Sequence, residues 1–213
     1  MDLDAVRKHY ESALDVGQNV GQKVGWRDTE SQQVRFEAIL QIMRGLSFAE
    51  VGDFGCGTGD LLNFLRDRGW SGMYLGTDIS SRMITECTSA FSHDRFTNFF
   101  ESSLPPTAEV VVASGIFNVC LDNSVELWTQ YCRGLIKLMW RSSSRAIVFN
   151  MLSEDSDEDH RKSGLAYMNA SDWLTFCRTH FSRHVRLDQA YGQYDFTIAV
   201  FREPPQGTWA GGR

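Results

Sequence analysis

The stretch Gly55-Cys56-Gly57-Thr58-Gly59 has the composition of a ligand-binding turn. Val51 to Phe54 before it predict a strand, and Asp60 to Leu62 after it begin a helical pattern. Glycine tolerates positive φ and lets a ligand approach the backbone, while the first turn of a helix presents unpaired N–H groups. The stretch therefore predicts a loop that binds a ligand between a strand and a helix.

An acidic residue, Asp78, ends the next predicted strand, about twenty residues after this loop, where a carboxylate can accept hydrogen bonds from both hydroxyls of a ribose. Dinucleotide-binding loops usually read G-x-G-x-x-G, whereas the third glycine here is Gly59 and residue 60 is Asp. This spacing weakens an interpretation as a nicotinamide-dinucleotide site. Strand, loop, helix, strand and Asp together predict a site for a nucleoside-containing cofactor.

The hydrophobic pattern around this site alternates between strand and helix, which predicts a parallel sheet. The unbroken apolar runs 110–113 and 146–149 are typical of strands that are covered on both faces. Two helices are expected before the first strand, near residues 3–14 and 34–43. Strands are expected near 50–54, 73–77, 96–100, 110–113, 145–151, 184–187 and 196–201, and helices near 61–68, 81–91, 125–140 and 173–181.

Composition limits the classes of protein and partner. A chain of 213 residues with 42% hydrophobic residues is typical of one ordinary domain. The net charge of -6, without a block of Lys or Arg, argues against a nucleic-acid partner. No apolar run approaches the roughly 20 residues that span a bilayer, so we expect a cytoplasmic protein without membrane contact. Five cysteines without C-x-x-C spacing predict reduced thiols and no metal site.

Three stretches, 53–59, 77–79 and 110–118, resemble the class I S-adenosylmethionine-dependent methyltransferases. The resemblance extends over residues 34–203. It implies an α/β fold with a Rossmann-like seven-stranded, mostly parallel sheet, an antiparallel last strand, helices on both faces and extra N-terminal helices. We expect a single domain, with a cap helix and loop over 1–33, the core over 34–203 and a tail over 204–213.

The resemblance also implies S-adenosyl-L-methionine as the cofactor. By similarity, the glycine loop contacts the methionine and ribose parts, Asp53 reaches the amino group and Asp78 binds the ribose. Ile79 and Met83 are expected against adenine. The family commonly has an acid after the third strand to bind the adenine amine, and here the position is ambiguous. The loop residues expected at the cofactor are Gly55, Cys56, Gly57 and Gly59, and the candidates for the adenine edge are Glu101, Ser102 and Ser103.

Two further groups are expected to face the cofactor. Ser114, Phe117 and Asn118 follow the fourth strand, at the edge where α/β sheets open onto ligands. Asn118 is either a polar turn residue or part of the site. The N-terminal segment, with Tyr10, is expected to close over the cofactor.

Two N-terminal residues of that segment have alternative interpretations. Arg35 either pairs with the methionine carboxylate, which matches a guanidinium fork, or is an exposed helix charge. Trp26 either caps the sulfonium by cation–π attraction or packs in the core.

An acidic run follows the fifth strand and has five acids in six positions between Glu154 and Asp159. Such a run is typical of a solvated loop, and the alternatives are a lid or a site that attracts a cationic acceptor. Near it, His160 and Tyr167 are candidate proton acceptors, and we add Asn118 to them as candidate catalytic residues. Tyr191 and Tyr194 are further candidate proton acceptors near the same edge of the sheet.

The leading hypothesis is a methyltransferase that acts on a small-molecule acceptor, in secondary metabolism. The chain has no Asn-Pro-Pro-Tyr or Asp-Pro-Pro-Tyr after the fourth strand and no Pro-Cys pair, which argues against nucleic-acid modification. One alternative keeps the cofactor and cyclises its aminobutyrate arm, which releases methylthioadenosine. A second alternative is a non-catalytic, methyltransferase-like partner subunit. The sequence makes no prediction of the oligomeric state.

Overall fold

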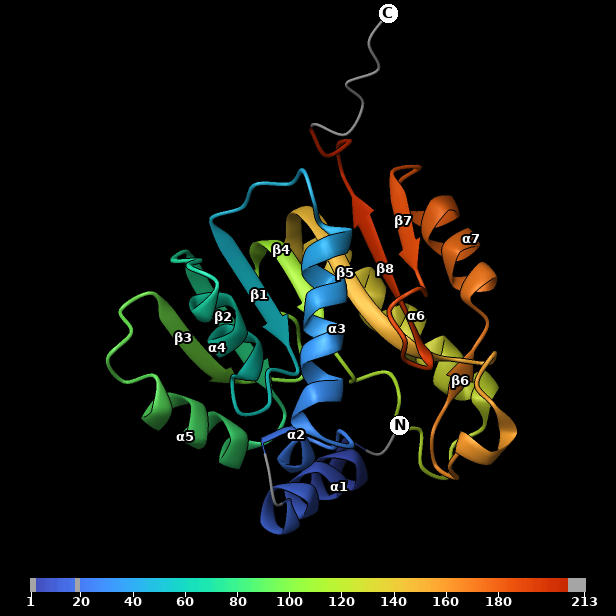
Figure 1. Ribbon diagram of the computed structural model, residues 1–213, viewed down its shortest axis with the longest axis horizontal. Coiled ribbons are helices and arrows are strands. Elements are labelled where there is room, and N and C mark those ends of the chain that lie inside the picture. Colours follow the sequence, from blue (N-terminus) through green and yellow to red (C-terminus); the bar gives the residue numbers. More distant parts are fainter. Residues whose placement is uncertain (1–2, 18–19, 207–213) are drawn as a thin grey trace, which may run out of the picture.

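A mixed sheet of eight strands forms the centre of the structure, a computed structural model that describes residues 3–17 and 20–206 (Figure 1). Seven strands follow the order β3-β2-β1-β4-β5-β8-β7, and the short β6 pairs with β5. Strands β1 to β5 are parallel to one another, whereas β8 runs antiparallel to β5 and β7. The strands are β1 Glu50–Phe54, β2 Met73–Asp78, β3 Thr97–Glu101, β4 Ala108–Ala113, β5 Ser143–Ser153, β6 Tyr167–Met168, β7 Val185–Asp188 and β8 Asp195–Phe201.

This architecture confirms the expected Rossmann-like sheet with an antiparallel last strand. The continuous apolar runs belong to β4 and β5, whose residues 110–113 and 146–149 are all buried. Strand β6 was not predicted, because two residues are too few for a hydrophobic alternation to show.

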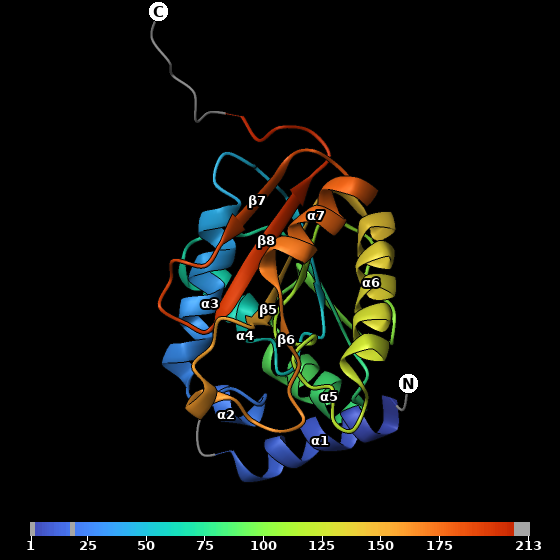
Figure 2. The same ribbon diagram turned by 90° about the vertical axis from the view of Figure 1, so that its right-hand side faces the viewer.

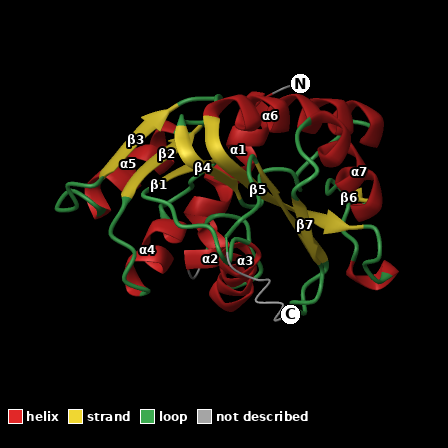
Figure 3. Ribbon diagram, turned by 90° about the horizontal axis from the view of Figure 1, so that it is seen from above, coloured by secondary structure: helices red, strands yellow, loops and turns green. Residues whose placement is uncertain are grey.

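Helices cover both faces of the sheet (Figures 2 and 3). Apolar side chains of α6 and α7 pack on one face, and those of α3 and α4 pack on the other. Helices α1 and α2 lie beyond the carboxyl end of β1, at the bottom of Figure 1. The helices are α1 Leu3–Val16, α2 Val20–Lys23, α3 Thr29–Ile42, α4 Asp60–Asp67, α5 Ser81–Ala90, α6 Val125–Ser142, α7 Ala170–His180 and the 3-10 turn η1 Glu158–His160.

Helix α3 begins five residues earlier than the apolar pattern indicated, so it crosses the expected boundary between the cap and the core at residue 34. Its first turn is polar and depends on a capping box. The Asp28 carboxylate accepts a hydrogen bond from the Ser31 N–H at 2.7 Å, and the Ser31 hydroxyl accepts one from the Asp28 N–H at 3.4 Å. Of the expected tail, residues 207–213 lie outside the described residues.

Within the described ranges, no helix has both the length and the apolar character needed to cross a membrane.

Candidate active site

A cavity of about 330 Å³ opens where the parallel strands β1, β2 and β4 end. The carboxyl edge of such a sheet is the usual place for a ligand, because loops of different length leave space there. Thirteen of the predicted site residues line this cavity although they are distant in sequence. They are Tyr10, Trp26, Arg35, Asp53, Gly55, Cys56, Gly57, Asp78, Met83, Ser114, Asn118, His160 and Tyr167.

The glycine loop is tied to the end of β2. The N–H groups of Gly55 and Cys56 donate to the Thr77 carbonyl at 2.7 and 3.0 Å. Gly55 has φ +80°, and a Cβ atom there would lie 2.2 Å from a methyl group of Ile116. Only glycine fits this position, because a side chain would meet both the left-handed backbone and Ile116.

Asp78 is fixed by the loop itself. Its carboxylate accepts hydrogen bonds from the N–H of Gly57 at 3.0 Å and from the N–H of Ser80 at 2.9 Å. Burial raises the pKa of Asp78 above its ordinary value, although these backbone donors act in the opposite direction. Both bonds hold an acceptor carboxylate at the cavity wall.

Asp53 is the second carboxylate in the wall, and it is only 3% exposed. It accepts a hydrogen bond from the hydroxyl of Tyr74, which lies on the neighbouring strand β2. Burial raises the pKa of Asp53 to about 7, the Tyr74 hydrogen bond opposes this rise, and the negative charges of Asp78 and Asp60 add to it.

Asp60 is a third carboxylate in the same wall, and the sequence analysis missed it as a site residue. It accepts hydrogen bonds from the Gln32 amide at 3.0 Å and from the Thr58 hydroxyl at 3.1 Å. Burial raises its pKa. Its place directly after the third glycine was the available signal. The sequence held no such signal for Gln32, because its partner Asp60 is 28 positions away.

A second cavity of about 80 Å³ adjoins the first, since Tyr10, Gly55, Asp78 and Ile116 line both. Ile79, which does not line the main cavity, lines this one. Of the three candidates for the adenine edge, the structure places two at this cavity, Ser102 and Ser103, and it places Glu101 at neither cavity.

Helix α1 covers this part of the site through polar contacts. The Tyr10 hydroxyl donates to the Gly115 carbonyl at 3.3 Å, and the Ser80 hydroxyl donates to Glu11 at 2.8 Å. Further along the helix, Asp15 forms an exposed ion pair with Arg82 at 2.5 Å. Three polar contacts, of Tyr10, Glu11 and Asp15, thus hold α1 over this part of the site.

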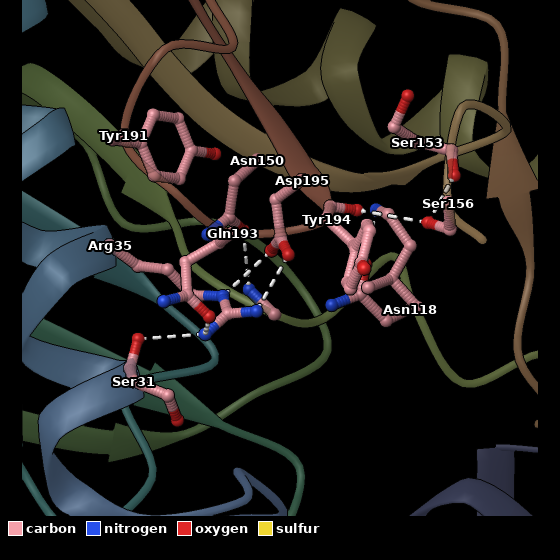
Figure 4. Close-up of polar contacts among 12 residues, drawn as sticks. Ser31, Arg35, Asn118, Asn150, Ser153, Ser156, Tyr191, Gln193, Tyr194 and Asp195 are labelled. Atoms are coloured by element: carbon pink, nitrogen blue, oxygen red, sulfur yellow. Dashed lines mark hydrogen bonds and ion pairs between the residues drawn. The ribbon is translucent and has the colours of Figure 1, made fainter. Parts of the chain in front are cut away.

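Arg35 is buried and bound to Asp195 rather than exposed (Figure 4). Its Nε and Nη2 donate to the two carboxylate oxygens of Asp195 at 2.7 and 2.6 Å, and its Nη1 donates to the Ser31 carbonyl at 2.7 Å. Both interpretations of Arg35 therefore need correction. The helix charge is not exposed, and the guanidinium fork expected for the methionine carboxylate already holds a protein carboxylate.

Trp26 lies over this guanidinium, with its ring centroid 4.3 Å from Cζ of Arg35. It lines the cavity and is not part of either hydrophobic core cluster. A Cβ atom on Gly115 would lie 2.6 Å from Cζ2 of Trp26. The cation–π contact that the sequence suggested for a ligand is thus made with Arg35.

The opposite end of the cavity receives residues from the acidic segment, but not its carboxylates. Ser156, His160 and Lys162 line the cavity. Glu154 binds the Asn169 amide, and Asp157 accepts a hydrogen bond from the Tyr194 hydroxyl. No acid between 154 and 159 lines the cavity, which argues against a site that attracts a cationic acceptor.

His160 and Tyr167 have defined partners at this end. Nδ1 of His160 lies 2.9 Å from Oδ1 of Asp159, and its ring lies 5.0 Å from that of Tyr194 between centroids, with the two planes tilted by 37°. The Tyr167 hydroxyl accepts a hydrogen bond from the N–H of Lys162 at 2.9 Å. Potential metal-binding atoms of Asp157, Asp159 and His160 lie within 4.8 Å of one another, but the residues are exposed and already bound as described.

Asn118 lies in the cavity wall and also makes a hydrogen bond that supports the turn. It lines the cavity, and its side-chain oxygen accepts a hydrogen bond from the Leu152 N–H at 3.1 Å, which joins the loop after β4 to β5.

Two predicted site residues lie elsewhere. Phe117 is 0% exposed and packs edge-on against Phe149 at 5.8 Å in the hydrophobic core, so its side chain is not part of the cavity wall. Gly59 caps α4 and faces Phe91. Sequence reasoning placed Phe117 wrongly because the residues on both sides of it, Ile116 and Asn118, line the cavity, and the sequence does not show that the ring between them turns into the core.

A doubly wound sheet with a glycine loop, Asp78 and a cavity at the strand ends defines a nucleoside-cofactor enzyme of the methyltransferase type. Residues 52–141 match the family model described as "Methyltransferase domain". The chain is 30% identical over 162 residues to "Putative methyltransferase Rv1506c" of Mycobacterium tuberculosis (strain ATCC 25618 / H37Rv), which covers 76% of this chain and 98% of that protein.

Solved structures of methyltransferases share the fold. Magnesium protoporphyrin IX methyltransferase (ChlM) from Synechocystis PCC 6803 with bound SAM has a TM-score of 0.63 and 13% identity, covering 95% of this chain and 98% of that chain. Human N-acetylserotonin methyltransferase in complex with SAM has a TM-score of 0.55 and 16% identity, covering 95% of this chain and 65% of that chain. The chain belongs to the class I S-adenosylmethionine-dependent methyltransferase family, with S-adenosylmethionine as its cofactor.

Proposed function

We propose that the protein transfers the methyl group of S-adenosylmethionine to a small-molecule acceptor that binds at the His160 end of the cavity. The observation that carries this proposal is the continuity of the cavity. The same space is lined by the glycine loop with Asp53 and Asp78 and, at its other end, by His160 and Tyr167. A cofactor and an acceptor therefore share one enclosure, which methyl transfer requires.

In this arrangement the carboxylates bind the cofactor. Asp78 receives the ribose hydroxyls, Asp53 receives the ammonium group, and the small second cavity with Ile79, Ser102 and Ser103 receives adenine. Asp60 adds negative charge near the cationic cofactor. The cofactor supplies an activated methyl group, and the chain orients it and excludes water with α1 and Trp26.

His160 is the candidate general base, which would remove a proton from the small molecule that receives the methyl group. Its Nδ1 faces the Asp159 carboxylate, so Nε2 is the nitrogen left to receive a proton. The Tyr167 hydroxyl accepts from a backbone N–H and keeps its own proton for donation to a bound acceptor. Asn118 fixes the loop between these groups and β5.

The size and charge of the site support a small acceptor rather than a nucleic acid. The cavity is about 330 Å³ and must also hold the cofactor, and the net charge of -6 of the chain opposes a phosphate polymer. Solved structures with this fold are named for a metal porphyrin in one case and for N-acetylserotonin in another, so the fold alone does not determine the acceptor. A role in secondary metabolism remains part of the proposal.

Incubation of the purified protein with S-adenosylmethionine, first alone and then with a metabolite extract, tests this function. Mass spectrometry would quantify adenosylhomocysteine and methylthioadenosine. Adenosylhomocysteine that forms only with extract, together with a product heavier by one methylene, is the expected result. Methylthioadenosine without extract would replace methyl transfer by cyclisation of the aminobutyrate arm. Tight cofactor binding without either product would indicate a non-catalytic subunit.

A further inference from the structure

Asp53 lies beside the glycine loop, and its carboxylate has one hydrogen-bonding partner. Among the described residues, the Tyr74 hydroxyl is the one group that donates to its carboxylate. Tyr74 is fully buried, and its ring packs against Phe99 at 5.9 Å, so its hydroxyl is held in a fixed direction. The pair joins neighbouring parallel strands, because Asp53 belongs to β1 and Tyr74 to β2. The carboxylate thus faces the cavity in an orientation that the Tyr74 hydroxyl sets.

Among the residues that the structure describes, the titratable groups that shift the pKa of Asp53 include no cation. The titratable groups near Asp53 are Tyr74 and Asp78 on β2, Asp60 at the start of α4 and Cys56 in the glycine loop. Arg27, Arg35 and Lys162 also line the cavity. Arg27 is paired with Asp28 and Arg35 with Asp195, and none of the three is among the groups that shift the pKa of Asp53. An ionised Asp53 therefore has negative neighbours and low solvation until a cation enters the cavity, and burial raises its pKa to about 7 in the empty site.

We propose that Tyr74 is a positioning residue of the cofactor site, which holds Asp53 for the cofactor's ammonium group, and that binding of this group expels a proton from Asp53. The inference rests on the proposed placement of the ammonium group at Asp53. In the balanced step, the neutral carboxyl releases its proton to solvent and the resulting carboxylate pairs with the ammonium group, so no further reactant is needed.

The sign of the pH dependence follows from this exchange. Below pH 7 the empty site holds a proton that must leave, so affinity falls by up to tenfold for each unit of pH. Above pH 7 the carboxylate is already ionised, and affinity no longer depends on this group. A ligand that lacks the ammonium group does not exchange the proton.

Isothermal titration calorimetry at pH 6 and pH 8, each in two buffers of different ionisation enthalpy, measures the protons released. The two probes are adenosylhomocysteine, which has the ammonium group, and methylthioadenosine, which lacks it. Both have the same adenine and ribose, so any titration of Asp78 by the ribose cancels in their difference. We expect adenosylhomocysteine to release about one proton more than methylthioadenosine at pH 6 and almost none more at pH 8.

Two variants test whether the Tyr74 hydroxyl controls the proton release from Asp53. Tyr74→Phe removes the donor that lowers the pKa of Asp53, so the affinity for adenosylhomocysteine at pH 7 should fall about tenfold and recover at higher pH. The affinity for methylthioadenosine should stay the same. Tyr191→Phe is the control, because this half-buried hydroxyl bonds to Thr197 and does not line the cavity. Circular dichroism would verify that each variant is folded.

Equal proton release by the two ligands would overturn the proposal, and so would a pH profile of Tyr74→Phe that matches Tyr191→Phe. The wild-type comparison decides the proton exchange even when Tyr74→Phe does not fold. Failure here is distinct from failure of the proposed function, because a methylated product can form whether or not Asp53 exchanges a proton.

Discussion

Arg35 and Asp195 are joined by two parallel N–H···O bonds across 160 positions of the sequence (Figure 4). The pair links α3 to the first residue of β8, and both side chains are almost fully buried. Burial of two charges removes their hydration, so the pair contributes less to stability than its short distances suggest. Loss of one partner, however, leaves the other charge buried without compensation.

Arg35→Met should therefore lower the free energy of unfolding by about 3–5 kcal/mol. The double variant Arg35→Met with Asp195→Leu should recover most of this loss, because no unpaired charge remains. Urea denaturation measures both. Arg68→Met is the matched control, since the Arg68–Glu37 pair is exposed and should contribute about 0–1 kcal/mol. A loss in Arg35→Met no larger than that in Arg68→Met would contradict the expected cost.

Gly115→Ala should weaken cofactor binding. Its Cβ atom would lie 2.6 Å from the Trp26 ring, and Gly115 has φ +86°, so the substitution displaces a wall of the cavity. Gly69→Ala is the control, because Gly69 has φ +82° but no atom within 4 Å of the added Cβ. Both variants should lose about 1–2 kcal/mol of stability from the left-handed backbone. Only Gly115→Ala should raise the Kd for adenosylhomocysteine in calorimetry, and equal binding by the two variants would exclude this role of Trp26.

Phe117→Ala should act on stability rather than on the cofactor. The ring is buried against Phe149, so its removal leaves a cavity in the core and costs about 3–5 kcal/mol. At a temperature where the variant is folded, its Kd for adenosylhomocysteine should remain within twofold of wild type. A large change in Kd with little change in the urea midpoint of unfolding would indicate that Phe117 contacts the cofactor after all.

His160→Gln should lower kcat by about 10²–10⁴ if the acceptor loses a proton during transfer. Asp159→Asn should lower kcat less and leave KM unchanged, because Asp159 acts through the orientation of His160. Added imidazole should restore part of the activity of His160→Gln and none of that of Asp159→Asn. Once an acceptor is known, steady-state kinetics decides this, and an unchanged kcat in His160→Gln would exclude His160 as the base.

Without cofactor, the stability of the protein should fall as pH rises from about 4 to about 7. Burial raises the pKa of Asp53 to about 7 in the folded state, against about 3.9 in the unfolded chain, so the folded state binds more protons in this range. Asp53→Asn removes this contribution. Urea unfolding should show that the variant gains up to about 4 kcal/mol on wild type between pH 4 and pH 8. A constant difference would show that Asp53 is ionised in the empty site at low pH.

The parallel core and the cofactor half of the site were predictable from the sequence, because both depend on local patterns. Strand periodicity located β1 to β5, and the short spacing from the glycine loop to Asp78 located the ribose-binding end. The partners of buried charges were not predictable in this way. Arg35 and Asp195, or Gln32 and Asp60, meet only when elements far apart in the chain pack together.

The direction of side chains in loops was also beyond the sequence. The acidic run after β5 has a composition that suggests attraction of cations, yet the carboxylates of Glu154, Asp155, Asp157 and Asp159 bond within the loop or to Tyr194 and Asn169. A shift of one residue in a turn exchanges which side chain faces the cavity. For this reason His160, and none of the acids before it, lines the site.

The position of β8 between β5 and β7 constrains how the chain can fold during its synthesis. Residues 143–153 leave the ribosome several seconds before residues 195–201, at synthesis rates of about 5–20 residues per second. During that interval one edge of β5 has no strand beside it, and such an edge is a template for pairing with other chains. The nascent protein should therefore need protection by a chaperone until its final strand emerges, however stable the finished sheet is.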